Sequence, residues 1–220
     1  MGVIIDYLKG RNINFKDYII KINDNIDLLA SSNNISLVEE FLTDYLLQRA
    51  LSEQKIYRAF FRNMLVRKIL DNNIKRNDYD YVVIDSQPNF SLLSVTSIIY
   101  AQNIIAVIKP ELFSILDIDY LKKIITNLEK KYKISIRIAG IIINAFEKRN
   151  KLPEKMIKTL YKKYRKDLTI FDQKIRYLVH YQKSITFKRE PVFMSFPNTE
   201  ASKDLMELFS QLEGKVNRFS

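Results

Sequence analysis

The sequence has no cysteine, no tryptophan, one histidine and only four glycines among its 220 residues. The lack of cysteine excludes disulfide frameworks, thiolate catalysis and cysteine-ligated metal sites. The single histidine, His180, excludes a zinc site built from histidines and argues against a Ser-His-Asp triad. The glycines, Gly2, Gly10, Gly140 and Gly214, have neither the spacing of a Walker A loop nor that of a dinucleotide-binding fingerprint. This sequence therefore holds no glycine-rich phosphate-binding loop.

Long apolar runs are also lacking. The longest, such as Ile138 to Ile143, fall far short of the roughly 18 residues that a membrane span requires. The first ten residues include Asp6 and have no uninterrupted apolar stretch, so they do not read as a signal peptide. The carboxyl-terminal segment carries Glu207 and Glu213 and few lysines, which favours a docked helix over a basic membrane anchor. These features predict a cytoplasmic protein without a membrane partner.

The positive charge is concentrated in one part of the chain. The formal net charge is +11, and residues 121–189 contain 20 Lys or Arg against 5 Asp or Glu. The remainder carries a slight excess of acid, so a uniform bias toward lysine does not explain the distribution. A region of this kind indicates a polyanionic partner such as nucleic acid, although a solvated helical face is the simpler structural alternative.

The pattern of apolar residues predicts alternating strands and helices. Short runs rich in Val and Ile are typical of strands buried on both faces of a parallel sheet; they span residues 26–29, 81–84, 104–108, 136–143 and, less distinctly, 168–171. Helical spacing predicts helices over residues 36–70, 118–128, 153–164 and 198–212, the first opened by a capping box at Ser36 and Glu39. We expect an α/β fold with a mostly parallel sheet and helices on both faces. No linker divides the chain, so residues 1–220 are expected to form a single domain.

Asp85 follows the apolar run Tyr81 to Ile84 directly. An acid in this place lies at the carboxyl edge of a parallel sheet, where open α/β folds bind their ligands. Such a carboxylate can hold Mg²⁺, usually through water, in a nucleoside triphosphatase. The alternative is that Asp85 caps the helix that follows.

The segment from Tyr79 to Pro88 resembles the Walker B strand of the ParA/Soj/MinD family of partition ATPases, which reads like YDYIIIDTPP. Further segments are similar to that family in the same order along the chain. They are Asp27 to Ser31, Ile104 to Phe113, Ile138 to Asn144, Lys174-Ile175-Arg176 and Glu190-Pro191-Val192. The resemblance implies a deviant P-loop NTPase-like fold and a role in plasmid or chromosome partition, with ATP and Mg²⁺ as cofactors.

The resemblance also implies roles for three residues. Asp85 would be the Walker B acid that holds Mg²⁺ through water. Asn144 would face the adenine at the end of its strand, and Arg176 would lie beside the base. Without the family, Asn144 reads as a strand-end turn residue and Arg176 as a surface residue.

The departures from the family concern its catalytic apparatus. The family opens with a strand, the loop Lys-Gly-Gly-x-Gly-Lys-Thr, a helix and a second strand that ends in a catalytic Asp. The resemblance begins after these, around Val3 to Gly10, so a βαβ unit of about 30 or more residues is absent from this sequence. Gln87 and Lys174 also stand where the family has proline. Because phosphoryl transfer depends on positioning and charge stabilisation, we expect this truncated chain not to hydrolyse ATP and to bind it weakly or not at all.

ParA-type proteins bind DNA without sequence specificity as ATP-bound dimers, and a ParB-type centromere-binding protein stimulates their hydrolysis. The resemblance thus implies DNA, a ParB-type protein and a second copy of the chain as partners, and a nucleoid-associated location. The candidate DNA-binding residues are Lys162, Lys163, Arg165, Lys166, Lys183, Lys188 and Arg189. Two alternatives remain: a degenerate, non-catalytic relative that acts as a DNA-binding or regulatory module, and an unrelated basic α/β protein that binds nucleic acid.

Overall fold

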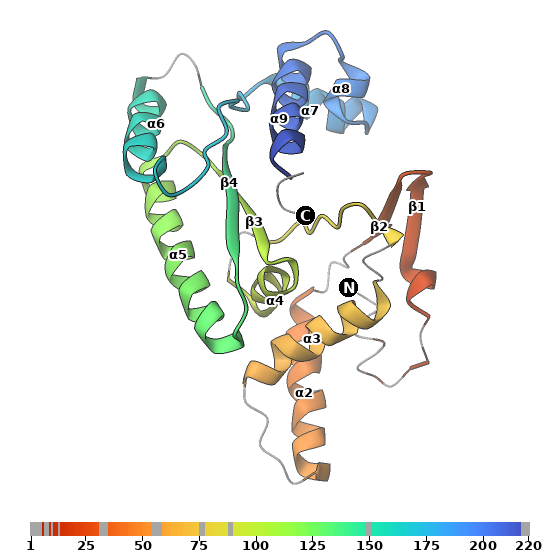
Figure 1. Ribbon diagram of the computed structural model, residues 1–220. Helices are drawn as coiled ribbons and strands as arrows, with labels where there is room; N and C mark the ends of the chain where they lie inside the picture. The colour runs from red at the N-terminus through yellow and green to blue at the C-terminus, as the bar shows by residue number, and fades with distance from the viewer. Residues whose placement is uncertain are drawn as a thin grey trace. The chain divides into compact units, whose positions relative to one another are not determined.

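The computed structural model describes residues 6, 9, 11–12, 14–30, 35–53, 59–74, 78–87, 90–147 and 151–216. The chain separates into two compact units, Met1–Ala101 (unit 1) and Gln102–Ser220 (unit 2), whose elements are labelled in Figure 1. Each unit has a hydrophobic core of its own. The expectation of a single domain over residues 1–220 stays a prediction.

Unit 1 is a β-hairpin followed by helices. Its elements are η1 (Phe15–Tyr18), β1 (Ile19–Asn23), β2 (Ile26–Leu29), α2 (Ile35–Glu53), α3 (Ala59–Asn73) and α4 (Leu92–Ala101). The core is made by Phe15, Val38, Leu42, Val66, Ile69 and Leu93. The single helix predicted over residues 36–70 is wrong: the structure has two helices there, and α2 begins at Ile35. The side chain of Ser36 lies outside the described residues, so the capping box stays a prediction.

The strand predicted at residues 26–29 exists, but the prediction of a buried parallel strand is wrong. β2 pairs antiparallel with β1, and Ile20 lies opposite Leu28. The backbone N–H of Asn25 donates to Asn23 Oδ1 at 2.9 Å, an Asx turn that reverses the chain within two residues. Local turn chemistry therefore decided the direction of pairing. Ile26 and Leu28 are 53% and 45% exposed.

The strand predicted at residues 81–84 is not formed. The segment is irregular, Tyr81 is 59% exposed and Val83 is 90% exposed. A strand needs a neighbour for its backbone N–H and C=O groups, and none of the described segments pairs with this one. The segment has the composition of a buried strand, but none of the described strands lies beside it to form the backbone hydrogen bonds of a sheet.

Unit 2 carries the parallel part of the fold (Figure 1). Its elements are β3 (Asn103–Ile108), α5 (Leu112–Tyr132), β4 (Arg137–Ile143), α6 (Lys151–Tyr164), α7 (Val179–Lys183), the π-helical turn η3 (Ser184–Lys188), α8 (Val192–Ser195) and α9 (Glu200–Val216). β3 and β4 pair in parallel. The predictions of strands at residues 104–108 and 136–143 and of helices at 118–128, 153–164 and 198–212 are confirmed within a few residues, although α5 begins six residues earlier. At residues 168–171 the structure forms only a bridge between Ile141 and Ile170.

Successive side chains of β4 enter different cores, as strand geometry requires. Ile141 and Ile143 pack with buried residues of α5 and α6. Ile142 packs with Phe171, Ile175 and Leu208, the last from α9. The sheet is therefore covered by helices on both faces, which confirms the α/β fold expected from the sequence.

Gly140 lies where β4 and Phe171 approach most closely. A Cβ added at Gly140 would lie 3.0 Å from Cζ of the Phe171 ring and nearer still to Cε2. Phe171 is 1% exposed, so the ring has no open space into which it could move. Glycine is needed here because the Phe171 ring occupies the space that a Cβ would take.

We predict that Gly140→Ala lowers the free energy of unfolding by about 1–3 kcal/mol, because overpacking forces side chains from their preferred rotamers. The measurement is urea unfolding followed by circular dichroism. Gly214→Ala is the matched control: outside its own turn of α9, no atom of the described residues lies within 4 Å of its added Cβ. It should raise stability by about 0.5–1 kcal/mol, because alanine favours a helix. Equal effects at the two positions would contradict the close approach.

Candidate functional site

The carboxyl edge of the parallel strands brings two of the predicted site residues into one region. Asn144 directly follows β4, and its backbone N–H donates to the carbonyl of Ile108, the last residue of β3, at 2.7 Å. Two residues later Phe146 forms a parallel bridge with Arg176. This edge is where open α/β folds bind ligands. The structure therefore places Asn144 and the backbone of Arg176 at the same end of unit 2.

Asn144 stabilises the turn that ends β4. Its Oδ1 accepts a hydrogen bond from the N–H of Ala145 at 2.8 Å. Ala145 has φ 53°, in the left-handed region. The Nδ2 amide group has no hydrogen-bond partner among the described residues. Asn144 is thus a turn residue that also keeps two N–H groups able to donate to a ligand.

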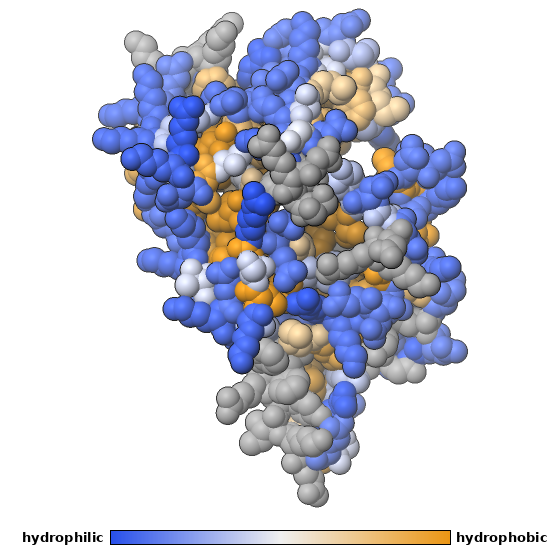
Figure 2. Space-filling view, viewed as in Figure 1, coloured by the Kyte–Doolittle hydropathy of each residue, from blue (hydrophilic) through white to orange (hydrophobic). Residues whose placement is uncertain are grey.

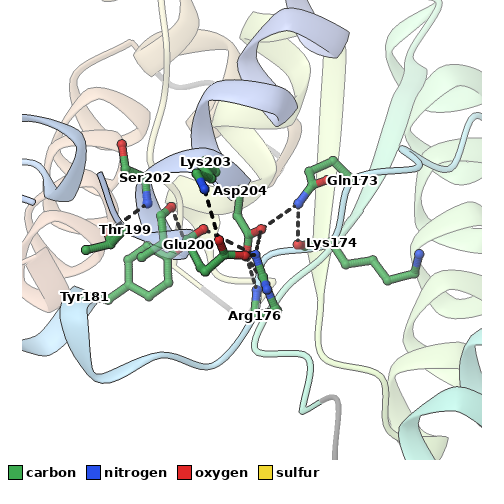
Figure 3. Close-up of polar contacts among 10 residues, drawn as sticks. Gln173, Lys174, Arg176, Tyr181, Thr199, Glu200, Ser202, Lys203 and Asp204 are labelled. Carbon is green, nitrogen blue, oxygen red and sulfur yellow. Dashed lines mark hydrogen bonds and ion pairs between the residues drawn. The ribbon is translucent and has the colours of Figure 1, made fainter. Parts of the chain in front are cut away.

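Arg176 is held by two carboxylates of α9 (Figure 3). Its Nε donates to Asp204 Oδ2 at 2.8 Å and its Nη2 to Asp204 Oδ1 at 2.6 Å, a bidentate geometry. Nη2 also lies 2.7 Å from Glu200 Oε2. The two acids differ in environment, since the side chain of Asp204 is 3% exposed and that of Glu200 is 57% exposed. The side chain of Arg176 is therefore directed to α9.

Asp204 is the centre of this cluster. It also accepts a hydrogen bond from the backbone N–H of Arg176 at 3.1 Å and one from Gln173 Nε2 at 2.9 Å. A buried carboxylate is stable only when it is paired and fully hydrogen-bonded, and Asp204 meets both conditions. The cluster attaches α9 to the segment that extends the sheet beyond β4.

The charges of the cluster stabilise one another. Hydrogen bonds to Asp204, and then to Glu200, raise the pKa of Arg176 above its ordinary value. The hydrogen bond from Arg176 lowers the pKa of Glu200. Burial raises the pKa of Tyr181 to about 12, with a further contribution from the charge of Asp204. All three groups therefore keep one charge state across neutral pH.

Asp204 is not among the site residues predicted from the sequence, although the sequence contains a signal for it. Ala201 and Leu208 of α9 are buried, and Asp204 lies between them at helical spacing, on the face that turns to the core. An acid in that position requires a cationic or donor partner. The pattern indicates that a partner exists but does not say which residue it is.

Asp85 belongs to unit 1 and is exposed. It has no hydrogen bond or ion pair among the described residues. The following helix, α4, is capped by Ser91, whose Oγ accepts from the N–H of Ser94 at 3.3 Å. The structural alternative for Asp85, a helix cap, is therefore not observed, and its role as a Walker B acid stays a prediction. Within the described ranges there is no cluster of three His, Cys, Asp or Glu side chains able to hold a metal ion.

The seven predicted DNA-binding residues are all exposed. They lie in two segments: the end of α6 with the turn after it, and the end of α7 with η3 and the residue after it. The blue, hydrophilic areas of Figure 2 include the outer surfaces of α5 and α6. In the described part of the chain no helix is long and apolar enough to cross a bilayer.

Two of the seven cations are engaged in contacts within unit 2. Lys163 pairs with Asp119 of α5, a contact that raises the pKa of the lysine and lowers that of the acid. Tyr164 reinforces it with a hydroxyl 2.7 Å from Asp119 Oδ1. Arg165 lies over the ring of Tyr161, 5.8 Å from its centroid. The remaining five have no side-chain partner among the described residues; they are Lys162, Lys166, Lys183, Lys188 and Arg189.

Comparison with known proteins gives consistent matches. The family model described as an AAA domain, AAA_31, matches residues 3–138. The chain is 28% identical over 165 residues to the uncharacterized protein MJECL24 of Methanocaldococcus jannaschii. This match covers 74% of the chain and 58% of MJECL24. The chain is 25% identical to the virulence plasmid ParA family protein pGP5-D of Chlamydia psittaci, covering 88% and 66%. The chain thus spans less than two thirds of either relative.

Among solved structures, the fold is similar to that of the ATP complex of McdA from Cyanothece. The TM-score is 0.72 at 16% sequence identity, and the match covers 96% of this chain and 75% of that one. At this identity the similarity establishes the fold.

We predict that Asp204→Ala lowers the free energy of unfolding by about 2–4 kcal/mol, because it leaves the Arg176 guanidinium without its buried partner. Glu200→Ala removes the exposed partner of the same arginine and should destabilise the protein much less, because solvent screens an exposed ion pair. Urea unfolding of both variants tests the difference. A smaller loss for Asp204→Ala than for Glu200→Ala would contradict the assignment of Asp204 as the centre of the cluster.

Proposed function

Because the chain belongs to the ParA/MinD-type family of partition ATPases, we propose that it is a partition protein that binds DNA without sequence specificity. Its partners on this proposal are DNA, a ParB-type centromere-binding protein and a second copy of the chain. The proposed location is the cytoplasm, in association with the nucleoid. The relatives named ParA family proteins support this class of function.

The observation that carries the proposal is the set of exposed cations that have no side-chain partner among the described residues. Lys162 lies in the last turn of α6, Lys166 lies in the turn that follows it, and Lys183, Lys188 and Arg189 lie around η3. Together they belong to the region with 20 Lys or Arg against 5 Asp or Glu. On this proposal, DNA phosphates supply the negative charge that pairs with these side chains. Contacts of this kind carry no sequence information, so binding should be non-specific and strongly dependent on salt.

Nucleotide binding is supported only in part. The amide of Asn144 can donate to a base at the carboxyl edge of the strands, and the similar McdA structure is an ATP complex. The guanidinium of Arg176 is occupied by Asp204 and Glu200. For Mg²⁺, Asp85 offers a single carboxylate, which suffices only together with the phosphates of a bound nucleotide. The sequence has no glycine-rich loop to hold those phosphates.

On these grounds the 220-residue chain by itself does not hydrolyse ATP. The alternative function is that of a degenerate, non-catalytic relative, a DNA-binding or regulatory module. The engagement of Arg176 with α9 favours this alternative, because it gives that residue a structural role. The two functions differ in the role of ATP: in the partition mechanism ATP strengthens DNA binding, whereas a module binds DNA without ATP.

We predict that changing Lys183, Lys188 and Arg189 together to Gln weakens binding to duplex DNA and lowers the slope of log affinity against log salt by about 3, since each phosphate contact contributes roughly 0.9. Fluorescence anisotropy with labelled duplexes of two unrelated sequences is the measurement. The control changes Lys16, Lys21 and Lys68, in unit 1, to Gln, with the same loss of charge. A wild-type chain that fails to bind at low salt, or a control as weak as the triple variant, would count against the proposal.

We also predict that the purified chain releases no phosphate from ATP above the background rate, because the groups that position phosphates are absent from the sequence. A phosphate-release assay with Mg²⁺, with and without DNA, tests this. Turnover that disappears in Asp85→Asn would overturn the prediction and establish Asp85 as a catalytic residue.

A further inference from the structure

The segment that follows Ser184 forms an exposed tip made of both apolar and basic residues. Every residue from 185 to 191, here called the tip, is exposed. Ile185 is 72% exposed and Phe187 is 76% exposed. Most of the tip is the π-helical turn η3. Single π-helical turns are rare and frequently lie at functional sites.

The tip is anchored on ordered structure. Tyr181 of α7 donates from its hydroxyl to the carbonyl of Ala201 in α9 at 3.0 Å. Ser184, at the start of η3, is buried and donates from Oγ to the carbonyl of Tyr181 at 2.8 Å. On the other side of the tip, the ring of Phe193 in α8 meets that of Phe209 in α9 edge to face, with centroids 6.4 Å apart. The exposure of Phe187 is therefore a property of a fixed turn.

Phe187 and Ile185 are left outside the core while α7 and α8 on either side of them are attached to α9. In the area of α8, Figure 2 shows a pale orange, apolar patch at the upper right, and Met194 of α8 is also 64% exposed. Exposed apolar residues gathered in one place indicate an interaction site. Burial of two large apolar side chains would contribute to the affinity of whatever covers them.

The charges around the tip indicate the chemistry of that partner. Lys183, Lys188 and Arg189 lie within one turn of the apolar pair, and Glu190 is the single acid in the tip. The occupant is therefore anionic and also accepts an apolar side chain. Duplex DNA has both properties, because phosphates flank base steps into which proteins insert phenylalanine or isoleucine.

An anionic lipid surface shares part of this chemistry, but membrane-surface helices present a long apolar face along several turns. The apolar residues of the tip occupy a single turn between cations. This arrangement, one wedge with cations on both sides, fits a base step between phosphates better than a bilayer.

We propose that Phe187, supported by Ile185, is an apolar wedge that enters the stack of duplex DNA while Lys183, Lys188 and Arg189 contact the neighbouring phosphates. This inference rests on the proposed DNA-binding function and adds to it a deformation of the DNA. Binding remains non-specific in sequence but favours steps that unstack easily, such as TA.

The test compares wild type with Phe187→Ala and Ile185→Ala on duplexes that carry 2-aminopurine at a TA step. Phe113→Ala is the matched control, since Phe113 is 72% exposed and lies at the start of α5, outside the basic tip. We expect Phe187→Ala to bind about tenfold more weakly at every salt concentration, with an unchanged salt slope, because no phosphate contact is lost. Wild type and Phe113→Ala should raise 2-aminopurine fluorescence on binding, and Phe187→Ala should not.

The possible failures are distinguishable. If wild type binds no DNA, the proposed function itself fails, and the wedge fails with it. If wild type binds DNA but Phe187→Ala binds equally well and no variant changes 2-aminopurine fluorescence, the wedge alone is overturned. Vesicles of phosphatidylserine and phosphatidylcholine provide the third arm: binding to them that Phe187→Ala abolishes, with DNA affinity unchanged, would assign the tip to a membrane. Circular dichroism of each variant establishes that it is folded.

Discussion

Strand β4 lies inside unit 2, and both of its faces have to be covered at once. β3 pairs along one edge, and the segment around Ile170 meets the other. α5 and α6 cover the face of Ile141 and Ile143, while Phe171 and α9 cover the face of Ile142. The absence of a side chain at Gly140 allows the Phe171 ring to approach the strand. Because β4 is contacted at both edges and on both faces, the turn at Asn144 at its carboxyl end has a fixed position.

The Arg176–Asp204 pair extends this constraint from the sheet to α9. Replacing a buried ion pair by apolar side chains is often neutral for stability, so the pair is better explained by specificity of docking than by energy. A bidentate guanidinium accepts a carboxylate in few orientations, and this fixes the rotation of α9 against the sheet. Since α7 and α8 are attached to α9, the orientation of α9 also sets the orientation of the exposed tip between them. A residue that the family resemblance assigns to nucleotide binding thus also positions the proposed DNA-binding surface.

The sequence predicted an element correctly where the pattern of apolar residues depended on that element alone. The spacing of Ile118, Ile125 and Leu128 predicted α5, and the continuous apolar run ending at Ile143 predicted β4, because each pattern reports burial of the element that carries it. The run at residues 81–84 had an equally strong pattern and forms no strand, since a strand also requires a neighbour. The hairpin at Asn23 shows the opposite error: a turn of two residues decided the pairing, and apolar content did not reveal it.

The sequence by itself determined the family, the concentration of positive charge in residues 121–189 and the absence of a glycine-rich phosphate loop, because composition, order and spacing are properties of the chain alone. Only the tertiary structure decided which charges remain available. Lys163 pairs with Asp119, 44 residues away, and Arg176 pairs with Asp204, 28 residues away. Lys188 and Arg189 have no side-chain partner among the described residues. The tertiary structure also placed Phe187 outside the core. Charge pairing and burial depend on which distant segments meet, and that is fixed by packing around β4 and α9.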